Sequence, residues 1–487
     1  MGSDRIRPYV DINSKAFRAC HAPVDLRRRH APFHLHSMVV ILLFNLVSCR
    51  SDRPQPAPTF AETIAPIVYR NCAVCHRPGE AGPFPLLTYE DVVRKAKTIV
   101  AVTKARYMPP WPADPVYSHF LGERILSESD IQTIATWVEN GTPFGDPAKA
   151  PKPPEFASSS LGVPDLVVKM REPITLPGDN TDHFLVIKLP YEIPEDRFVR
   201  AIEFVPGNRK LMHHMNGHIV QYEDRKKDPF EGPYSVDRQN LRTLEESYAA
   251  IRVLNDDGSY PALTKSVANY LPGAVSPAGY GAGIGGWALN RRGAFLMRDV
   301  HYGPSPIEAE DLSYFNVYFT DKAPARPTQE MQLGTLGISE IVPPLIIPPN
   351  EVKTFTTKTI VDRDISLLTV NPHMHLLGKS FEAFAETPEG RKIPLVKIPK
   401  WNFRWQYFYM FPRMVKVPSG STIMVIGTYD NTEDNPNNPF SPPREVIGTN
   451  GSMRVTDEMF QLIITYVPYQ AGDENVALGD LSRSSRP

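Results

Sequence analysis

From about residue 164 onward, apolar residues occur in short runs that turn residues separate. The runs are rich in Val, Ile, Phe and Tyr, and examples lie at 184–189, 198–205, 315–319, 422–428 and 460–466. Closely spaced runs of this length and composition predict an all-β, sandwich-type fold. Because about 300 residues follow this pattern, two sandwiches fit it better than one. We place the boundary near residues 322–330 and predict jelly-roll-like domains at 164–325 and 326–470, followed by a polar tail at 471–487.

Residues 59–149 follow a different, helical pattern. Apolar residues recur at helical spacing over 60–69, and a second amphipathic stretch covers 131–138. The second stretch has an N-cap among residues 127–130 and a glycine stop at Asn140-Gly141, so we expect a helix between them. This region predicts a small all-α domain. The residues that follow, 145–163, are rich in Pro, Ala, Lys and Ser and predict an interdomain linker.

The first 49 residues predict an export segment. Residues 1–37 are polar and basic, and the apolar run from Met38 to Ser48 is too short to span a bilayer. A basic flank, a short apolar core and a small residue before the break fit a secretory signal. Leu46 to Cys49 resembles a bacterial lipobox, which would make Cys49 the lipidated first residue of an exported protein, periplasmic or anchored to the membrane. Two alternatives stay open: a start at Met38, and a buried apolar segment after a polar tail.

Composition narrows the range of partners. The 487 residues include 53 Lys and Arg against 54 Asp and Glu, so the net charge of −1 gives no general attraction to nucleic acid. Proline is frequent, at 50 residues against 30 glycines, which favours β-structure with many turns over long helices. The four cysteines are Cys20, Cys49, Cys72 and Cys75, so the sandwich region has no disulfide and must be stabilised by core burial.

A haem attachment motif lies in the helical region. Cys72, Cys75 and His76 form the sequence C-x-x-C-H, in which two thiols attach to the haem vinyl groups and the histidine ligates the iron. A zinc site would need a second pair of ligands, and a thioredoxin-type pair would need an α/β pattern, neither of which is present. Met108 is the only methionine between the motif and residue 150, so we predict it as the sixth iron ligand, with His119 as the competitor. We therefore predict a cytochrome c-like domain with one covalently bound haem c.

Histidines in the sandwich region are candidate metal ligands. His373 and His375 stand at i and i+2, where an extended strand points both side chains to one face. Pro372, directly before His373, predicts a strand end or an edge. His213 and His214 are adjacent, so both can reach one ion only if the backbone is irregular there. A surface or core position would explain any one of these histidines alone. The full set of candidates is His213, His214, His301, His373, His375 and Met459.

Four motifs around these residues occur together and in order. They are H-H-M at 213–215, V-H-Y-G at 300–303, H-x-H followed by L-G-K at 373–379, and D-E-M at 457–459. In this combination, residues 164–470 resemble the copper type II, ascorbate-dependent monooxygenases, the family of peptidylglycine alpha-hydroxylating and dopamine beta-monooxygenases. The resemblance implies two copper ions. An electron-relay copper would bind to His213, His214 and His301, and an oxygen-binding copper to His373, His375 and Met459. A thioether ligand favours Cu(I), the state that reacts with oxygen, which agrees with the second assignment.

The resemblance also implies an activity. The chain would insert one atom of O2 into a C–H bond of a small-molecule substrate and reduce the other atom to water. An external reductant, ascorbate-like or a redox protein, would supply electrons, and we expect the fused haem to pass them to the relay copper. A different class of function stays open, in which the chain binds copper and transfers electrons without turning over a substrate.

The sequence departs from the family at several positions. The relatives are rich in disulfides, whereas this region has none. The peptide-amidating enzymes carry an arginine two residues before H-x-H, where this chain has Asn371, and asparagine and tyrosine where it has Gln461 and Ile463. We therefore expect a less charged substrate and no peptide amidation. A zinc hydrolase or a cupin would need an acidic residue shortly after H-x-H, and positions 376–380 hold none. We expect His218 to be structural.

Overall fold

A computed structural model gives the fold of the chain. It describes residues 57–156, 161–222, 227–238, 241, 243–272, 279–281, 283–448 and 456–479. All of these belong to the compact unit Pro56–Pro487. The predicted export segment at 1–49 and its lipobox lie outside the described residues. Within the described part of the chain, no helix is long and apolar enough to cross a membrane.

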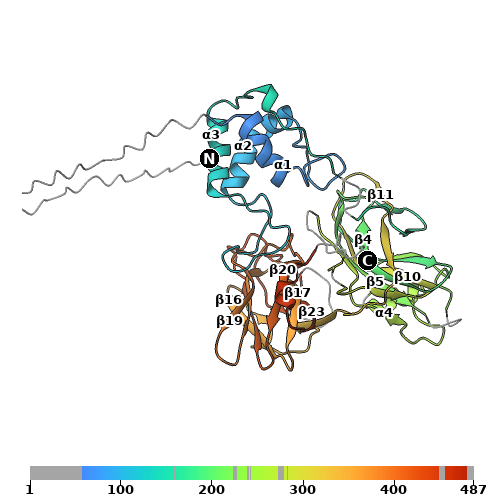
Figure 1. Cartoon of the computed structure of the whole chain (residues 1–487). Coiled ribbons are helices and arrows are strands. Elements are labelled where there is room, and N and C mark those ends of the chain that lie inside the picture. The colour runs from blue at the N-terminus through green and yellow to red at the C-terminus, as the bar shows by residue number, and fades with distance from the viewer. Residues whose placement is uncertain are drawn as a thin grey trace, which may run out of the picture. The chain divides into compact units, whose positions relative to one another are not determined.

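The helical region consists of a π-helical turn η1 (Phe60–Ile64), α1 (Ala65–Asn71), α2 (Tyr89–Lys104), α3 (Glu128–Glu139) and a 3₁₀ turn η2 (Pro147–Lys149). Figure 1 labels α1, α2 and α3. Both predicted helical stretches are confirmed. The hydroxyl of Ser127 accepts a hydrogen bond from the Asp130 N–H at 3.0 Å, which caps α3, and Gly141 follows its end with a φ of +79°. The helices enclose a small core that includes Phe60 and Trp137.

The first sandwich is built from two facing sheets. One has the strand order β1 (Leu166–Lys169), β12 (Tyr314–Thr320), β4 (Arg197–Val205) and β9 (Trp287–Leu289). The other has the order β6 (Ser235–Asp237), β3 (His183–Glu192), β10 (Arg292–Tyr302), β5 (Met212–Gln221) and β7 (Ala262–Leu263), and β8 (Ala268–Tyr270) also pairs with β5. Strands β2 (Ile174–Leu176) and β11 (Ala309–Asp311) form a separate pair. Phe295 of β10 stacks on Phe315 of β12 at 4.7 Å in the core, and α4 (Leu244–Ala250) covers the outer face of the larger sheet.

The second sandwich has the same plan. One sheet has the order β13 (Gln329–Gly334), β23 (Phe460–Pro468), β17 (Ile365–Met374) and β20 (Tyr409–Val417). The other has the order β14 (Ile341–Val342), β16 (Val352–Ile360), β21 (Thr422–Asp430), β18 (Gly378–Glu386) and β19 (Lys392–Ile398). Strands β15 (Ile346–Ile347) and β22 (Val446–Ile447) pair separately, and a 3₁₀ turn η3 (Asp473–Asn475) follows β23. Phe381 and Phe460 meet between the sheets at 5.8 Å.

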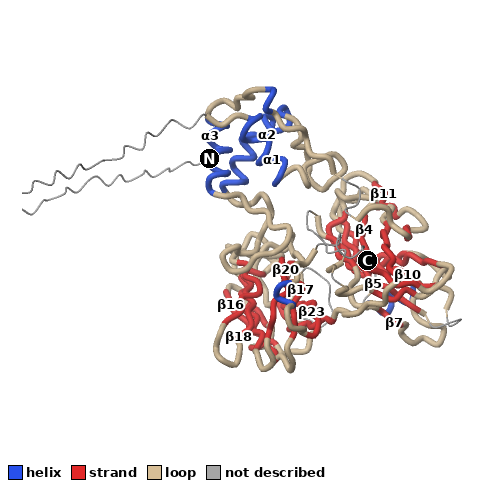
Figure 2. Tube along the Cα trace, viewed as in Figure 1, coloured by secondary structure: helices blue, strands red, loops and turns tan. Residues whose placement is uncertain are grey.

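The prediction of a mostly β chain with few helices is confirmed (Figure 2). Each of the five predicted strands overlaps an observed one, namely β3, β4, β12, β21 and β23. In β21 the residues alternate strictly between buried and half-buried, because one face of the strand packs into the core and the other does not. The other four strands lack this strict alternation, so it was their short apolar runs that predicted them.

The segment after Met108 packs against the second sandwich. Trp111 stacks on Tyr407 with ring centroids 5.7 Å apart, and the Phe120 ring lies 4.7 Å from that of Tyr409. The Tyr407 hydroxyl donates a hydrogen bond to the Pro110 carbonyl at 2.8 Å. Phe120 is buried in the core of this sandwich. A segment close in sequence to the haem motif is thus anchored on the sandwich that carries the H-x-H motif.

Candidate metal centres

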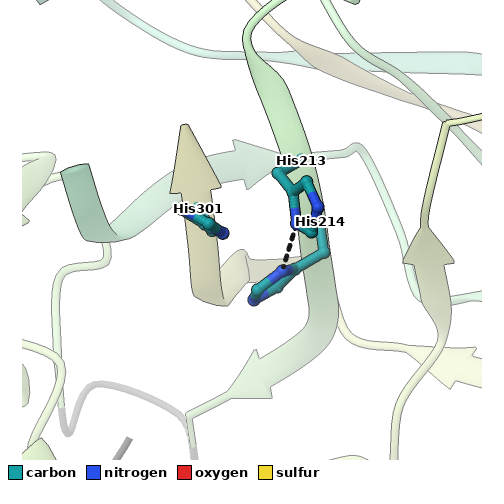
Figure 3. A group of neighbouring side chains, drawn as sticks. All are labelled: His213, His214 and His301. Atoms are coloured by element: carbon teal, nitrogen blue, oxygen red, sulfur yellow. Dashed lines mark hydrogen bonds between the residues drawn. The ribbon is translucent and has the colours of Figure 1, made fainter. Parts of the chain in front are cut away.

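Three histidines of the first sandwich lie together on two neighbouring strands. His213 and His214 belong to β5 and His301 to β10, and their ring nitrogens lie within 4.8 Å of one another (Figure 3). The predicted irregularity of the backbone is confirmed. Met212 pairs with Tyr302 and His214 pairs with His301, so His213 is an extra residue between the two pairs. Such a β-bulge re-aims side chains, which lets two adjacent histidines converge. This group could hold a metal ion.

The contacts of His301 determine which of its two ring nitrogens has a lone pair available for a metal ion. Its Nε2 lies 2.7 Å from Oδ1 of Asp182, and because a carboxylate accepts, the proton belongs on Nε2. The lone pair is then on Nδ1, which is buried and has no hydrogen-bond partner among the described residues. Phe184 stacks on the ring at 4.4 Å and holds its plane. A carboxylate on the far nitrogen is the usual support of a metal-ligating histidine.

The electrostatics keep His213 and His214 neutral. Burial, followed by the charge of His301, lowers the pKa of His213 to about 4. Burial likewise lowers the pKa of His214 well below its usual range. At neutral pH each of these two rings therefore has one protonated nitrogen and one nitrogen with a lone pair. Imidazole ligands suit copper, zinc, iron or nickel, and the site alone does not choose among them.

His373 and His375 form a second group at the end of β17. Their Nε2 atoms lie 3.2 Å apart. The predicted strand end is confirmed, because β17 stops one residue before His375 and its pairing with β20 stops at Val370. Pro372 therefore pairs only with β23, and its missing N–H costs the sheet no hydrogen bond on the other side. Burial and the charge of His375 lower the pKa of His373 to about 3, so this ring is also neutral.

The D-E-M motif lies beside His375. The Nδ1 of His375 donates to the carbonyl oxygen of Asp457 at 2.6 Å, which leaves the lone pair on Nε2. Glu458 is only 1% exposed, and its carboxyl group accepts hydrogen bonds from the N–H of His375 at 2.9 Å and of Leu377 at 2.7 Å. Burial raises the pKa of this carboxyl to about 8. Met459 follows directly and is buried. Glu458 thus ties the H-x-H turn to the strand that begins after Met459.

A loop that the sequence analysis did not single out covers the second group. Loop 399–408 joins β19 to β20 and has an aromatic residue at each of positions 401, 403, 405 and 407. The Phe403 ring meets the His375 ring edge to face at 5.5 Å. The Trp401 indole N–H donates to the His375 carbonyl at 3.1 Å. The signal that could have revealed this loop is its run of aromatic residues at every second position.

The C-x-x-C-H sequence, predicted to attach haem, occupies a loop after α1. Cys72 and Cys75 are free thiols and both are half-buried. The Nδ1 of His76 donates to the Phe84 carbonyl at 3.0 Å, which leaves the lone pair on Nε2. Burial lowers the pKa of His76 and keeps it neutral. The tautomer of His76 is therefore the one that an axial iron ligand requires.

The two candidates for the sixth iron ligand, His119 and Met108, lie in different surroundings. The His119 side chain is 73% exposed and its Nδ1 lies 3.3 Å from a carboxylate oxygen of Glu123. Met108 follows α2 and lines a cavity of about 390 Å³, together with Trp111 and Ile131 among others. Neither cysteine nor His76 lines this cavity, so the described contacts do not join Met108 to the C-x-x-C-H residues.

The contacts of His218, the last histidine of β5, indicate a structural role. The Nδ1 of His218 lies 3.0 Å from the carbonyl oxygen of Thr264, and the side chain is buried. Met212 and Met215 of the same strand are fully buried in the core. These residues hold β5 in place rather than extend the histidine group.

Comparisons with known proteins identify no family. No family model and no curated protein matches the sequence. Among solved structures, PNGF-II (crystallised in space group P21) aligns with a TM-score of 0.23 and 8% identity. The alignment covers 62% of this chain and 65% of the PNGF-II chain, which is less than two thirds of its length. The VP2 subviral particle of infectious bursal disease virus aligns with a TM-score of 0.16 and 9% identity, over 66% of this chain and 76% of that one. Similarities this weak carry no argument about fold or function.

Proposed function

We propose that the chain is a copper-dependent monooxygenase with a fused c-type haem. The observation that carries the proposal is the donor geometry of two separate histidine groups. Asp182 and the Asp457 carbonyl each hold the far nitrogen of one histidine, so lone pairs are presented through Nδ1 in the first group and Nε2 in the second. Two groups of half-buried to buried imidazoles, each with one tautomer fixed, suit a metal that cycles between Cu(I) and Cu(II), and a thioether such as that of Met459, next to Glu458 in sequence, would favour Cu(I).

Each group has a distinct role in this proposal. The ligands are His213, His214 and His301 for the electron-relay copper, and His373, His375 and Met459 for the copper that meets oxygen. When bound, the copper ions supply one-electron chemistry and oxygen activation. The chain's own residues orient and shield them. Asp182 holds the tautomer of His301, Glu458 fixes the turn that carries His375, and Phe403 and Trp401 close one side of that site to water.

The haem is proposed to bind through Cys72, Cys75 and His76, with Met108 as the sixth ligand. The neutral His76 with its Nδ1 held by a carbonyl supports the first part, and the exposed, carboxylate-paired imidazole of His119 makes it the weaker rival. The haem would pass electrons from an external reductant to the coppers. Export to the periplasm, with a lipid anchor at Cys49, is proposed on the sequence alone.

A second candidate function is copper binding and electron transfer without a substrate. Both proposals need the two histidine groups, so metal content does not separate them. They differ in whether the second group is a reaction site. The aromatic wall of loop 399–408 beside His375 favours a reaction site, because a pure relay needs no such wall.

Oxygen incorporation separates the two functions. The exported, copper-loaded chain is supplied with ¹⁸O2, a reductant and a panel of small organic compounds, and products are read by mass spectrometry. We expect a product with one ¹⁸O atom, lost in Met459→Ile and in His213→Ala. In single turnovers of the reduced chain, haem oxidation should follow product formation and stop in His213→Ala. Oxygen consumption that yields no oxygenated product across the panel would favour the electron-transfer function.

A further inference from the structure

The first histidine group depends on how the start of β5 is placed against the end of β10. At this point Met212 pairs with Tyr302. The turn before β5 is closed by Asn208, whose carbonyl accepts a hydrogen bond from the Met212 N–H at 3.0 Å. A shift of this turn would carry His213 and His214 with it, because they directly follow Met212.

A buried carboxylate joins this turn to the end of β10. Asp311 is the last residue of β11 and is only 1% exposed. Its Oδ1 accepts from the Asn208 N–H at 2.6 Å, and its Oδ2 accepts from the Tyr302 hydroxyl at 2.7 Å. The Ser313 hydroxyl also donates to Oδ2, at 2.7 Å. Burying a carboxylate is costly unless its oxygens are hydrogen-bonded, and these three donors meet that need from three separate parts of the chain.

The turn before β5 also packs closely on the backbone that follows Asp311. A Cβ atom at Gly207 would lie 2.5 Å from the Leu312 nitrogen and 2.7 Å from Oδ1 of Asp311. Both distances are too short for a real Cβ atom, so glycine is required here. The Gly207 N–H donates to the Ser313 hydroxyl at 3.0 Å. Packing and hydrogen bonds therefore fix the turn to Asp311 together.

Tyr302 connects the same carboxylate to His301. Val300 and Tyr302 both lie in the core of the first sandwich and are fully buried. Because neighbouring residues of a strand point to opposite faces, His301 between them points out of this core. There its ring lies 4.8 Å from that of His213 and 5.1 Å from that of His214. One carboxylate thus holds both the strand end that carries His301 and the turn that precedes the other two histidines.

We infer that Asp311 is the positioning residue that holds the two strands of the first histidine group in register. By tying β10 to the turn before β5, it sets the distance between His301 and the adjacent histidine pair. This inference rests on the proposed function of the group as a copper site. In a simpler role the same hydrogen bonds would only stabilise the sandwich, and their loss would lower stability without any change at the copper.

Copper affinity and stability, measured on the same variants, separate these two roles. Tyr302→Phe keeps the buried ring and removes one hydrogen bond to Asp311. Asp311→Asn replaces one of the two accepting oxygens with an NH2 group, which cannot accept. Tyr318→Phe is the matched control, because Tyr318 is also fully buried and its hydroxyl donates to a carboxylate oxygen of Glu203 at 3.2 Å, in the other sheet of the same sandwich.

The measurements use the full chain in a His375→Ala background, so that only the first group binds copper. Competition with a chelator of known affinity gives the Cu(II) affinity, electron paramagnetic resonance reports the ligands, and urea unfolding of the metal-free chain gives the stability. We expect Cu(II) affinity to fall about tenfold in Tyr302→Phe and further in Asp311→Asn, each with a changed Cu(II) spectrum, because residues that orient metal ligands have effects of this size.

In Tyr318→Phe the Cu(II) affinity and spectrum should match those of the parent chain, even though both tyrosine variants lose a buried hydrogen bond and should unfold at lower urea concentration. Unchanged affinity and spectrum in Tyr302→Phe would overturn the inference, whether or not Asp311→Asn folds. An equal loss of affinity in Tyr318→Phe would overturn it as well. A parent chain that binds no copper would instead overturn the proposed function.

Discussion

Replacing Asp182 with asparagine tests whether the first histidine group is a metal centre. The Asp182 carboxylate lies 2.7 Å from Nε2 of His301 and leaves the lone pair on the buried Nδ1. An asparagine that turns its oxygen to Nε2 keeps the hydrogen bond but loses the charge. One that turns its NH2 group there moves the proton to Nδ1 and blocks the ligand. Removing such a partner typically weakens metal binding about 10- to 100-fold, or roughly 1.4 to 2.8 kcal/mol.

Competition with a chelator of known affinity measures this change directly. The titration uses the full chain in a His375→Ala background, so that only the first group binds, and electron paramagnetic resonance of Cu(II) reports its ligands. Asp237→Asn is the matched control. Asp237 lies 3.2 Å from Nδ1 of His183 in the same sheet, so it is a similar carboxylate–histidine pair outside the histidine group. We expect the loss in Asp182→Asn, a smaller loss in Asp182→Glu and none in the control.

Two outcomes would refute this reasoning. Unchanged copper affinity and an unchanged Cu(II) spectrum in a folded Asp182→Asn chain would show that His301 is not held for a metal. An equal loss in Asp237→Asn would show that the effect is a general one of removing a carboxylate from this sheet.

Three further predictions concern other parts of the chain. Met459→Ile should retain Cu(II) at the second group but abolish turnover, because the ligand that favours Cu(I) is gone, and normal turnover would disprove its role. Met108→Ala should abolish the methionine–iron charge-transfer band and lower the haem potential, whereas an unchanged spectrum would point to His119. Although burial opposes it, hydrogen bonds from Arg326 and Ser366 lower the pKa of Asp473 from 3.8 to about 2. That shift is worth about 2 kcal/mol of unfolding free energy, present above pH 3.8 and lost as the pH falls through about 2, and Asp473→Asn should lose a similar amount in urea unfolding at pH 7.

The sequence predicted the features that depend on neighbours along the chain. The strands followed from apolar runs, and the start of α3 followed from the cap at Ser127, because both patterns extend over a few residues. The pairing of His373 with His375 was also local, since two residues apart on a strand share a face. The adjacency of His213 and His214 also predicted that the backbone is irregular there, but not that the irregularity is a β-bulge.

The residues that support the histidine groups from distant parts of the chain could not be predicted from such local patterns. Asp182 reaches His301 across 119 positions of sequence, and only the antiparallel pairing of β3 with β10 brings them together. The contact of Trp111 with Tyr407 depends on how the segment after Met108 packs on the second sandwich. Contacts of this kind are set by tertiary packing, which leaves no periodic signal in one sequence.

The copper content of the purified, full-length chain tests the two-site assignment most directly. We expect two copper ions in the wild-type chain, one in His214→Ala and one in His375→Ala, with different Cu(II) spectra for the two variants. The double variant should bind none. A wild-type chain that holds fewer than two coppers after loading, or a single substitution that removes both, would contradict the assignment of separate copper sites.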